Sequence, residues 1–205
     1  MRWVLGVCFA LLALAAAPAG AGENYEALVA RAKSGDATLD FRALRDAYAQ
    51  SPHYQPYGGD FDDARKAMIS AFNARDCTSA LAAADKVEAA IFIDITAHLV
   101  SGHCLDQAGD KAKADLHRAI AHGLMDSIIA SGDGKTTKTA FLVVTINEEY
   151  DALSAFQLQL GTQTLVQDDG HTFDRMDAKT KSQQNVTLFF QIDRPMAWLS
   201  HSLEH

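Results

Sequence analysis

The stretch RDCTSALAAADKV, residues 75–87, decides the fold because it returns in altered form as GDKAKADLHRAIA at residues 109–121. Asp76 aligns with Asp110, so the two copies lie 34 residues apart. A fixed period of about 20–50 residues indicates stacked structural units that bury a common core. The alanine-rich copies therefore predict helices that pack closely in antiparallel pairs.

The repeat resembles the tetratricopeptide superfamily, whose period is also about 34 residues. Ala80 and Ala114 occupy matching small positions, whereas His98 stands where a large aromatic residue is usual. The resemblance implies two degenerate repeats, at about residues 61–94 and 95–128.

Two further helices are expected before the repeats, where they would form an N-terminal cap. The first, YEALVARAKSG, ends at Gly35, and the second starts at Asp40, a good N-cap residue. Phe41, Leu44 and Tyr48 follow at helical spacing and form one apolar face. Asp60 is expected to cap the next helix.

After residue 131 the pattern favours strands. AFLVVTI, residues 140–146, is apolar and β-branched, as a buried strand requires. Asn147 is then expected to cap a short helix. Its expected apolar contacts are Tyr150, Leu153 and Phe156.

Three more strands are predicted near the C-terminus, and Asp169-Gly170 is a hairpin turn signal between the first two. Their ranges are 157–167, 171–178 and 185–192. A last helix is expected to begin with Pro195 in its first turn and to bury Met196, Trp198 and Leu199.

The predicted class is therefore α+β. Tetratricopeptide-like antiparallel helix pairs at residues 22–131 precede a small, mainly antiparallel sheet with one or two helices at residues 132–203. The N-terminal residues 1–21 read as a signal peptide, because the apolar run from Val4 to Ala17 is followed by small residues. We therefore expect an exported protein, periplasmic or secreted, with no membrane anchor once this segment is removed.

The chain carries a formal net charge of −8 and has no basic tract, which argues against nucleic-acid partners. SGDGKTTKTAF, residues 131–141, contains the Gly-Lys-Thr ending of a phosphate-binding loop. That loop needs a preceding strand and a following helix, whereas here the order is inverted. We expect no nucleotide and no other cofactor, and we interpret Lys135 as a loop residue.

Histidines are the first candidates for metal chemistry. His98/His103 and His117/His122 are each five residues apart, a spacing that places the members of a pair on different helix faces. Packing or surface roles are therefore favoured over metal ligation, and no metal site is predicted. Glu148-Glu149 is interpreted as an acidic first helical turn that favours the helix dipole, with a general-base role as the alternative.

The polar cluster DDGHTFD, residues 168–174, is the candidate catalytic site. Asp169, His171 and Asp174 could form an acid–base pair or bind a divalent cation. The alternative is a solvated hairpin, for which the Asp-Gly turn alone is sufficient.

Cys77 and Cys104 are the two cysteines that remain after signal removal. They lie at nearly equal distances from the predicted turn at residues 91–94, so the antiparallel helices bring them together. In an oxidising compartment this arrangement predicts a disulfide rather than two buried thiols.

Two stretches resemble a family of signal-bearing bacterial proteins catalogued as domain of unknown function 4919. They are DFRALRDAYAQSPHYQPYG, residues 40–58, and SGDGKTTKTAFLVVTINEEYDAL, residues 131–153. The resemblance covers about residues 24–200. It implies a layout of helices followed by a sheet, and it implies no catalytic residue.

Three functions stay open from the sequence. The first is an exported helical-repeat adaptor that binds a protein or peptide on its concave face or its sheet. The second is a secreted enzyme with a site near His171 and Asp174, to which Lys135 could contribute. The third is a structural or inhibitory subunit of an envelope complex.

Overall fold

The computed structural model describes residues 24–204, and the predicted signal peptide lies outside this range. The described residues form eight α-helices, one short 3-10 turn and four strands. In chain order they are α1 Tyr25–Lys33, α2 Phe41–Ala49, α3 Asp62–Asn73, α4 Cys77–Ala90, α5 Ile95–Gln107, α6 Lys111–Ile129, η1 Thr137–Thr139, β1 Phe141–Leu142, α7 Ile146–Ala155, β2 Gln159–Asp168, β3 His171–Lys179, β4 Asn185–Gln191 and α8 Asp193–Leu203.

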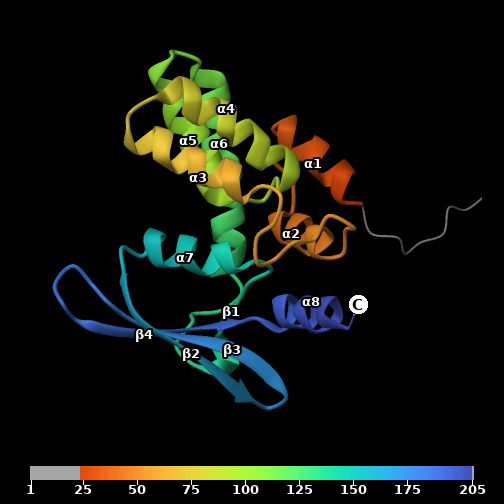
Figure 1. The fold of residues 1–205 in the computed structure, drawn as a ribbon, viewed down its shortest axis with the longest axis vertical. Coiled ribbons are helices and arrows are strands. Elements are labelled where there is room, and N and C mark those ends of the chain that lie inside the picture. The colour runs from red at the N-terminus through yellow and green to blue at the C-terminus, as the bar shows by residue number, and fades with distance from the viewer. Residues whose placement is uncertain (1–23, 205) are drawn as a thin grey trace, which may run out of the picture.

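The helices and the sheet form two parts with α7 between them (Figure 1). Helices α1–α6 lie on one side of α7, the strands lie on the other, and α8 packs beside the sheet. The α+β class predicted from the sequence is confirmed. The tetratricopeptide-like character of the helices and the division at residue 131 stay predictions. No helix within residues 24–204 has the length and apolar character needed to cross a membrane.

Aspartates fix the starts of four helices. The side chains of Asp40, Asp76, Asp94 and Asp110 each accept a hydrogen bond from a backbone N–H of the first turn, which otherwise has no partner. Asp60 was expected to do the same and does not. Helix α3 instead follows a turn in which the N–H of Asp62 donates to the carbonyl of Gly59.

Helices α4, α5 and α6 form consecutive hairpins. A disulfide joins Cys77, in the first turn of α4, to Cys104, in the last turn of α5, with their Cα atoms 5.2 Å apart. The link between these opposite ends requires the two helices to be antiparallel. On the other side of α5, a Cβ added to Gly102 would lie 3.1 Å from Cγ of Arg118 and 3.3 Å from the carbonyl oxygen of Ala114, so α5 and α6 approach closely at this glycine.

The sheet has the order β1-β4-β3-β2, with β1 parallel to β4 and the other neighbours antiparallel. Asp169 and Gly170 form the β2–β3 turn, and both have positive φ angles, as two-residue hairpins favour. The strand expected over residues 140–146 is only two residues long. It ends because the N–H of Val144 donates to the side chain of Glu148 instead of to a strand.

The start of α7 and the packing of two helices differ from expectation. Helix α7 begins at Ile146 with Thr145 as N-cap, so Asn147 is not the cap. Tyr150 and Phe156 are exposed, and among the three expected contacts of α7 Leu153 is the buried one. In α8 the buried residue is Pro195, whereas Met196, Trp198 and Leu199 are only partly buried. One side of α8 is open to solvent because the helix lies beside the sheet rather than beneath another layer.

Candidate metal centre

Three side chains from consecutive helices meet inside the helical part: Glu88 of α4, His98 of α5 and His117 of α6. The Nδ1 atoms of His98 and His117 are 3.0 Å apart. Oε1 of Glu88 lies 3.6 Å from Nδ1 of His98 and 3.4 Å from Nδ1 of His117. Within residues 24–204 this is the one group of three His, Cys, Asp or Glu side chains whose ligand atoms come within 4.8 Å of one another.

The helical hairpins place these side chains. Glu88 lies in the last turn of α4 and His98 in the first turn of α5, so the short connection at residues 91–94 brings them face to face. The turn between α5 and α6 returns the chain beside His98, and His117 projects from the second turn of α6. The group therefore depends on the arrangement of three helices rather than on a local motif.

A backbone carbonyl orients the ring of His98. Its Nε2 lies 2.7 Å from the carbonyl oxygen of Phe92, and His98 is fully buried. Because a carbonyl can only accept, Nε2 carries the hydrogen, and in the neutral ring the lone pair is on Nδ1. Burial lowers the pKa of His98 to about 3, so the ring is neutral at physiological pH. His98 thus directs an unprotonated nitrogen at His117 and Glu88.

Ser101 holds the carboxylate of Glu88, another member of the group. The hydroxyl of Ser101 donates to Oε1 of Glu88 over 2.8 Å. Burial is the main reason that the pKa of Glu88 is raised, to about 7. Burial is also the main reason that the pKa of His117 is lowered. All three side chains are therefore partly or fully desolvated, and contacts outside the group hold His98 and Glu88.

The separations of the three atoms match those of ligands around one small cation. Zn²⁺ bound by imidazole nitrogen and carboxylate oxygen at about 2.1 Å in tetrahedral geometry places its ligand atoms roughly 3.4 Å apart. The three separations here are 3.0, 3.4 and 3.6 Å. Metal-bound histidines usually donate their second nitrogen to a carbonyl or carboxylate, as His98 does to Phe92.

A cavity of about 290 Å³ borders the group. Glu88 and His117 line it, whereas His98 lies behind them in the core. The other lining residues are Lys33, Asp85, Ala89, Phe92, Leu116 and Ile120. The group is therefore reachable from solvent on one side.

The spacing of the histidines in the sequence does not indicate this arrangement. Within the pairs His98/His103 and His117/His122 the helix faces do differ, as the spacing of five residues predicts. The structure instead pairs His98 with His117 across two helices, while His103 and His122 are exposed. The signal that could have found the pair is symmetry about a turn, the argument that identified the two cysteines.

The structure does not bring the predicted catalytic residues together. His171 is exposed on β3, with its Nδ1 2.6 Å from a carboxylate oxygen of Asp193, and Asp169 lies in the hairpin turn. Asp174 is buried and accepts a hydrogen bond from the side chain of Gln163. Residues three apart on a strand point to opposite faces, so the side chains of His171 and Asp174 leave the sheet on different sides. A catalytic role for these residues stays a prediction.

Glu148 and Glu149 lie in the first turn of α7, as predicted, but both are buried rather than solvated. Glu148 pairs with Arg45 of α2 through two hydrogen bonds of 2.7 and 2.8 Å. Arg45 also donates to the carbonyl of Leu142. This buried pair therefore links α2, β1 and α7, where the two family-like stretches of sequence meet.

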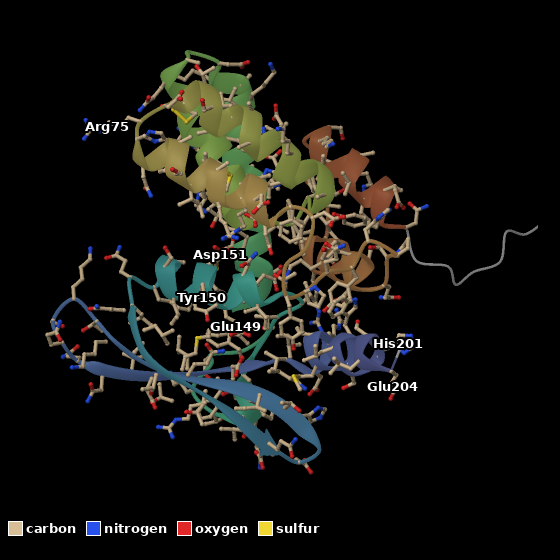
Figure 2. The ribbon with its side chains drawn as sticks, viewed as in Figure 1. Arg75, Glu149, Tyr150, Asp151, His201 and Glu204 are labelled. Atoms are coloured by element: carbon tan, nitrogen blue, oxygen red, sulfur yellow. A yellow bond between two sulfur atoms is a disulfide. The ribbon has the colours of Figure 1, made fainter. Side chains whose placement is uncertain are left out.

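Glu149 lies on the side of α7 that faces the sheet, and Asp151 on the side that faces the helices (Figure 2). Neither carboxyl oxygen of Glu149 has a hydrogen-bond partner in the described chain apart from the neighbouring acid Asp174. Burial, with Asp174 as the next cause, raises the pKa of Glu149 to about 9. At neutral pH the Glu149 carboxyl is protonated and can donate to Asp174.

The loop that contains Lys135 connects α6 to β1, which is the inverted order noted in the sequence. The N–H of Gly134 donates to the carbonyl of Thr139, and the N–H of Lys135 donates to the side chain of Asp133. These two backbone N–H groups therefore form hydrogen bonds within the loop itself.

One family model matches the chain. It is described as Domain of unknown function (DUF4919) and matches residues 20–201. No curated protein and no solved structure matches the chain.

Proposed function

The chain belongs to the DUF4919 family, as two stretches of its sequence predicted, and we propose that it binds a divalent transition-metal ion through Glu88, His98 and His117. Zn²⁺ fits this site best, because two imidazole nitrogens and one carboxylate oxygen are a common zinc ligand set. The observation that carries the proposal is the convergence of the three ligand atoms, with separations of 3.0 to 3.6 Å.

Two further contacts support a site that is built before the metal arrives. Phe92 fixes the ring nitrogen that His98 presents, and Ser101 holds the carboxylate oxygen of Glu88. Because these groups are already oriented, a metal ion need not order them on binding. The alternative is a hydrogen-bonded group in which Nδ1–H of His117 donates to His98, and it predicts no metal affinity.

The experiment is a calorimetric titration of Zn²⁺ into metal-free protein purified without a histidine tag. We expect one Zn²⁺ per chain for the wild type and loss of this binding in His117→Asn and Glu88→Gln. His103→Asn is the matched control, because His103 is exposed on the same helix as His98. Equal binding by His117→Asn and the wild type would contradict the proposal.

A specific observation favours protein binding as a second function. Strand β2 is at the edge of the sheet, and its first nine residues, 159–167, carry no charged side chain. Most of the strand is exposed, including Leu165 at 54%. Such an edge offers unpaired backbone groups to an extended segment of a partner. The test is Leu165→Lys, which should abolish capture of any partner bound at this edge and leave Zn²⁺ binding unchanged.

We also propose that the protein functions in an oxidising compartment outside the cytoplasm. The predicted signal peptide supports this proposal, and so does the Cys77–Cys104 disulfide, since such bonds persist mainly in exported proteins. Expression in a bacterium with fractionation of cytoplasm, periplasm and medium tests it. Recovery of uncleaved protein in the cytoplasm would contradict it.

A further inference from the structure

The proposed metal ion would have one coordination position that no protein atom takes. Tetrahedral zinc sites with three protein ligands keep a fourth position for water or another exogenous ligand. Here His98 approaches from the buried side, while Glu88 and His117 line the cavity of about 290 Å³. The fourth position therefore faces this cavity.

The cavity combines a cation with an apolar wall. Lys33 lines it, and its ammonium lies 5.4 Å from the centre of the Phe92 ring. Within the described chain no carboxylate forms an ion pair with Lys33. The apolar lining consists of Ala89, Phe92, Leu116 and Ile120.

We propose that the fourth position binds the carboxylate of a small organic acid, a step that rests on the proposed metal binding. One carboxylate oxygen would coordinate the metal, the carboxylate charge would interact with Lys33, and the apolar part would contact Phe92, Leu116 and Ile120. A cavity of this size is near the lower end for small-molecule sites.

The position of Asp85 favours a monocarboxylate over a dianion as the ligand. Asp85 lies on the cavity wall one turn before Glu88 on α4. A second negative charge near the metal disfavours a dianion such as phosphate more than a monocarboxylate. Asp85 is not among the three side chains whose ligand atoms converge, so it does not itself occupy the fourth coordination position.

The test uses Co²⁺ in place of Zn²⁺, because its visible absorption reports the ligands around the metal. Benzoate added to the Co²⁺ protein should change the visible spectrum in a saturable way, and acetate should do so more weakly. Phosphate should produce little change. Lys33→Ala should weaken benzoate binding by roughly tenfold, because it removes a charge-assisted contact. Lys33→Arg should retain most of it, and Lys86→Ala, an exposed lysine of α4, should have no effect.

The outcomes separate this inference from the proposed function. A Co²⁺ spectrum that is present but insensitive to benzoate would overturn the inference and leave metal binding intact. A spectrum that becomes sensitive only in Asp85→Asn would also overturn it, since Asp85 would then be the fourth ligand. A stronger response to phosphate than to benzoate would exclude the carboxylate class. Absence of any Co²⁺ binding would overturn both proposals.

Discussion

Nδ1 of His98 lies 3.0 Å from Nδ1 of His117, although 19 residues separate the two histidines in the chain. The ring of His98 is set by a hydrogen bond from its other nitrogen to the carbonyl of Phe92. Glu88 completes the group from the neighbouring helix, and Ser101 holds its carboxylate. The helices thus bring together ligand atoms and the groups that orient them.

Ser101→Ala tests whether the orientation of Glu88 matters. Removing a group that orients a metal ligand typically reduces metal affinity by about 10–100-fold. We expect a reduction in this range for Zn²⁺, measured by competition with a coloured chelator, and little loss of helical structure. Ser70→Ala, at an exposed position of α3, is the control. An unchanged affinity in Ser101→Ala would show that Glu88 is not a ligand held by Ser101.

The disulfide should stabilise the fold, whereas the arrangement of Glu88, His98 and His117 should not depend on it. Closing a loop over a separation of 27 residues contributes about 3.5 kcal/mol in the chain-entropy model. The Cys77→Ser/Cys104→Ser variant should lose stability of this order in urea titration. It should still bind Zn²⁺, because the disulfide joins the ends of α4 and α5 far from Glu88 and His98. Loss of both stability and Zn²⁺ binding in this variant would contradict the expectation that the disulfide is not needed for metal binding.

The buried pair of Arg45 and Glu148 should be needed for the contact between the helices and the sheet. Their side chains are 3% and 2% exposed, so Arg45→Met leaves an unpaired buried carboxylate. Breaking such a pair costs about 3–5 kcal/mol, whereas replacing both partners is far less harmful. Urea unfolding should show a large loss for Arg45→Met and partial recovery for Arg45→Met/Glu148→Gln. Equal losses in the two variants would argue against a coupled pair.

The buried carboxyl of Glu149 predicts a pH dependence of stability. Its pKa is about 9 in the folded state, above the ordinary value of 4.5, so the folded protein holds this proton more tightly than the unfolded chain. The contribution to stability is complete below pH 4.5 and is lost as the pH rises towards 9. The slope from one such group is at most about 1.4 kcal/mol per pH unit.

Glu149→Gln isolates this contribution. The amide stays neutral and can donate to Asp174, so the variant should lose less stability than the wild type between pH 6 and 9. Asp174, Glu148 and Asp151 also lie around α7, and the pKa of Asp151 is raised to about 7, so some pH dependence should remain. Identical pH profiles of unfolding free energy in the two proteins would contradict a protonated Glu149.

The sequence predicted several features that depend on local chemistry. Asp40 starts α2 because its carboxylate accepts from exposed amides of the first turn, and Asp169-Gly170 makes a hairpin because both residues tolerate positive φ. The same reasoning was wrong at Asp60 and Asn147, which cap no helix. The cysteine pair was found because the turn between its two helices could be located. These predictions need only a few neighbouring residues or one turn.

The features that the sequence did not predict depend on packing between distant elements. Glu148 and Glu149 look like a solvated first turn, and their burial follows only from the position of α7 between the helices and the sheet. Arg45 is 103 residues from its partner Glu148 in the chain. The proposed metal ligands come from three helices, so no motif spacing on one helix could indicate them.

X-ray absorption at the zinc edge of the Zn²⁺-loaded protein identifies the atoms bound to the metal. We expect one zinc per chain, bound by two imidazole nitrogens and by oxygen ligands at about 2.0–2.2 Å. In His117→Asn one imidazole should disappear from the spectrum or the zinc should be lost on dialysis. Sulfur ligands at about 2.3 Å, or a wild-type protein that retains no zinc after dialysis, would contradict the assignment of Glu88, His98 and His117 as the metal ligands.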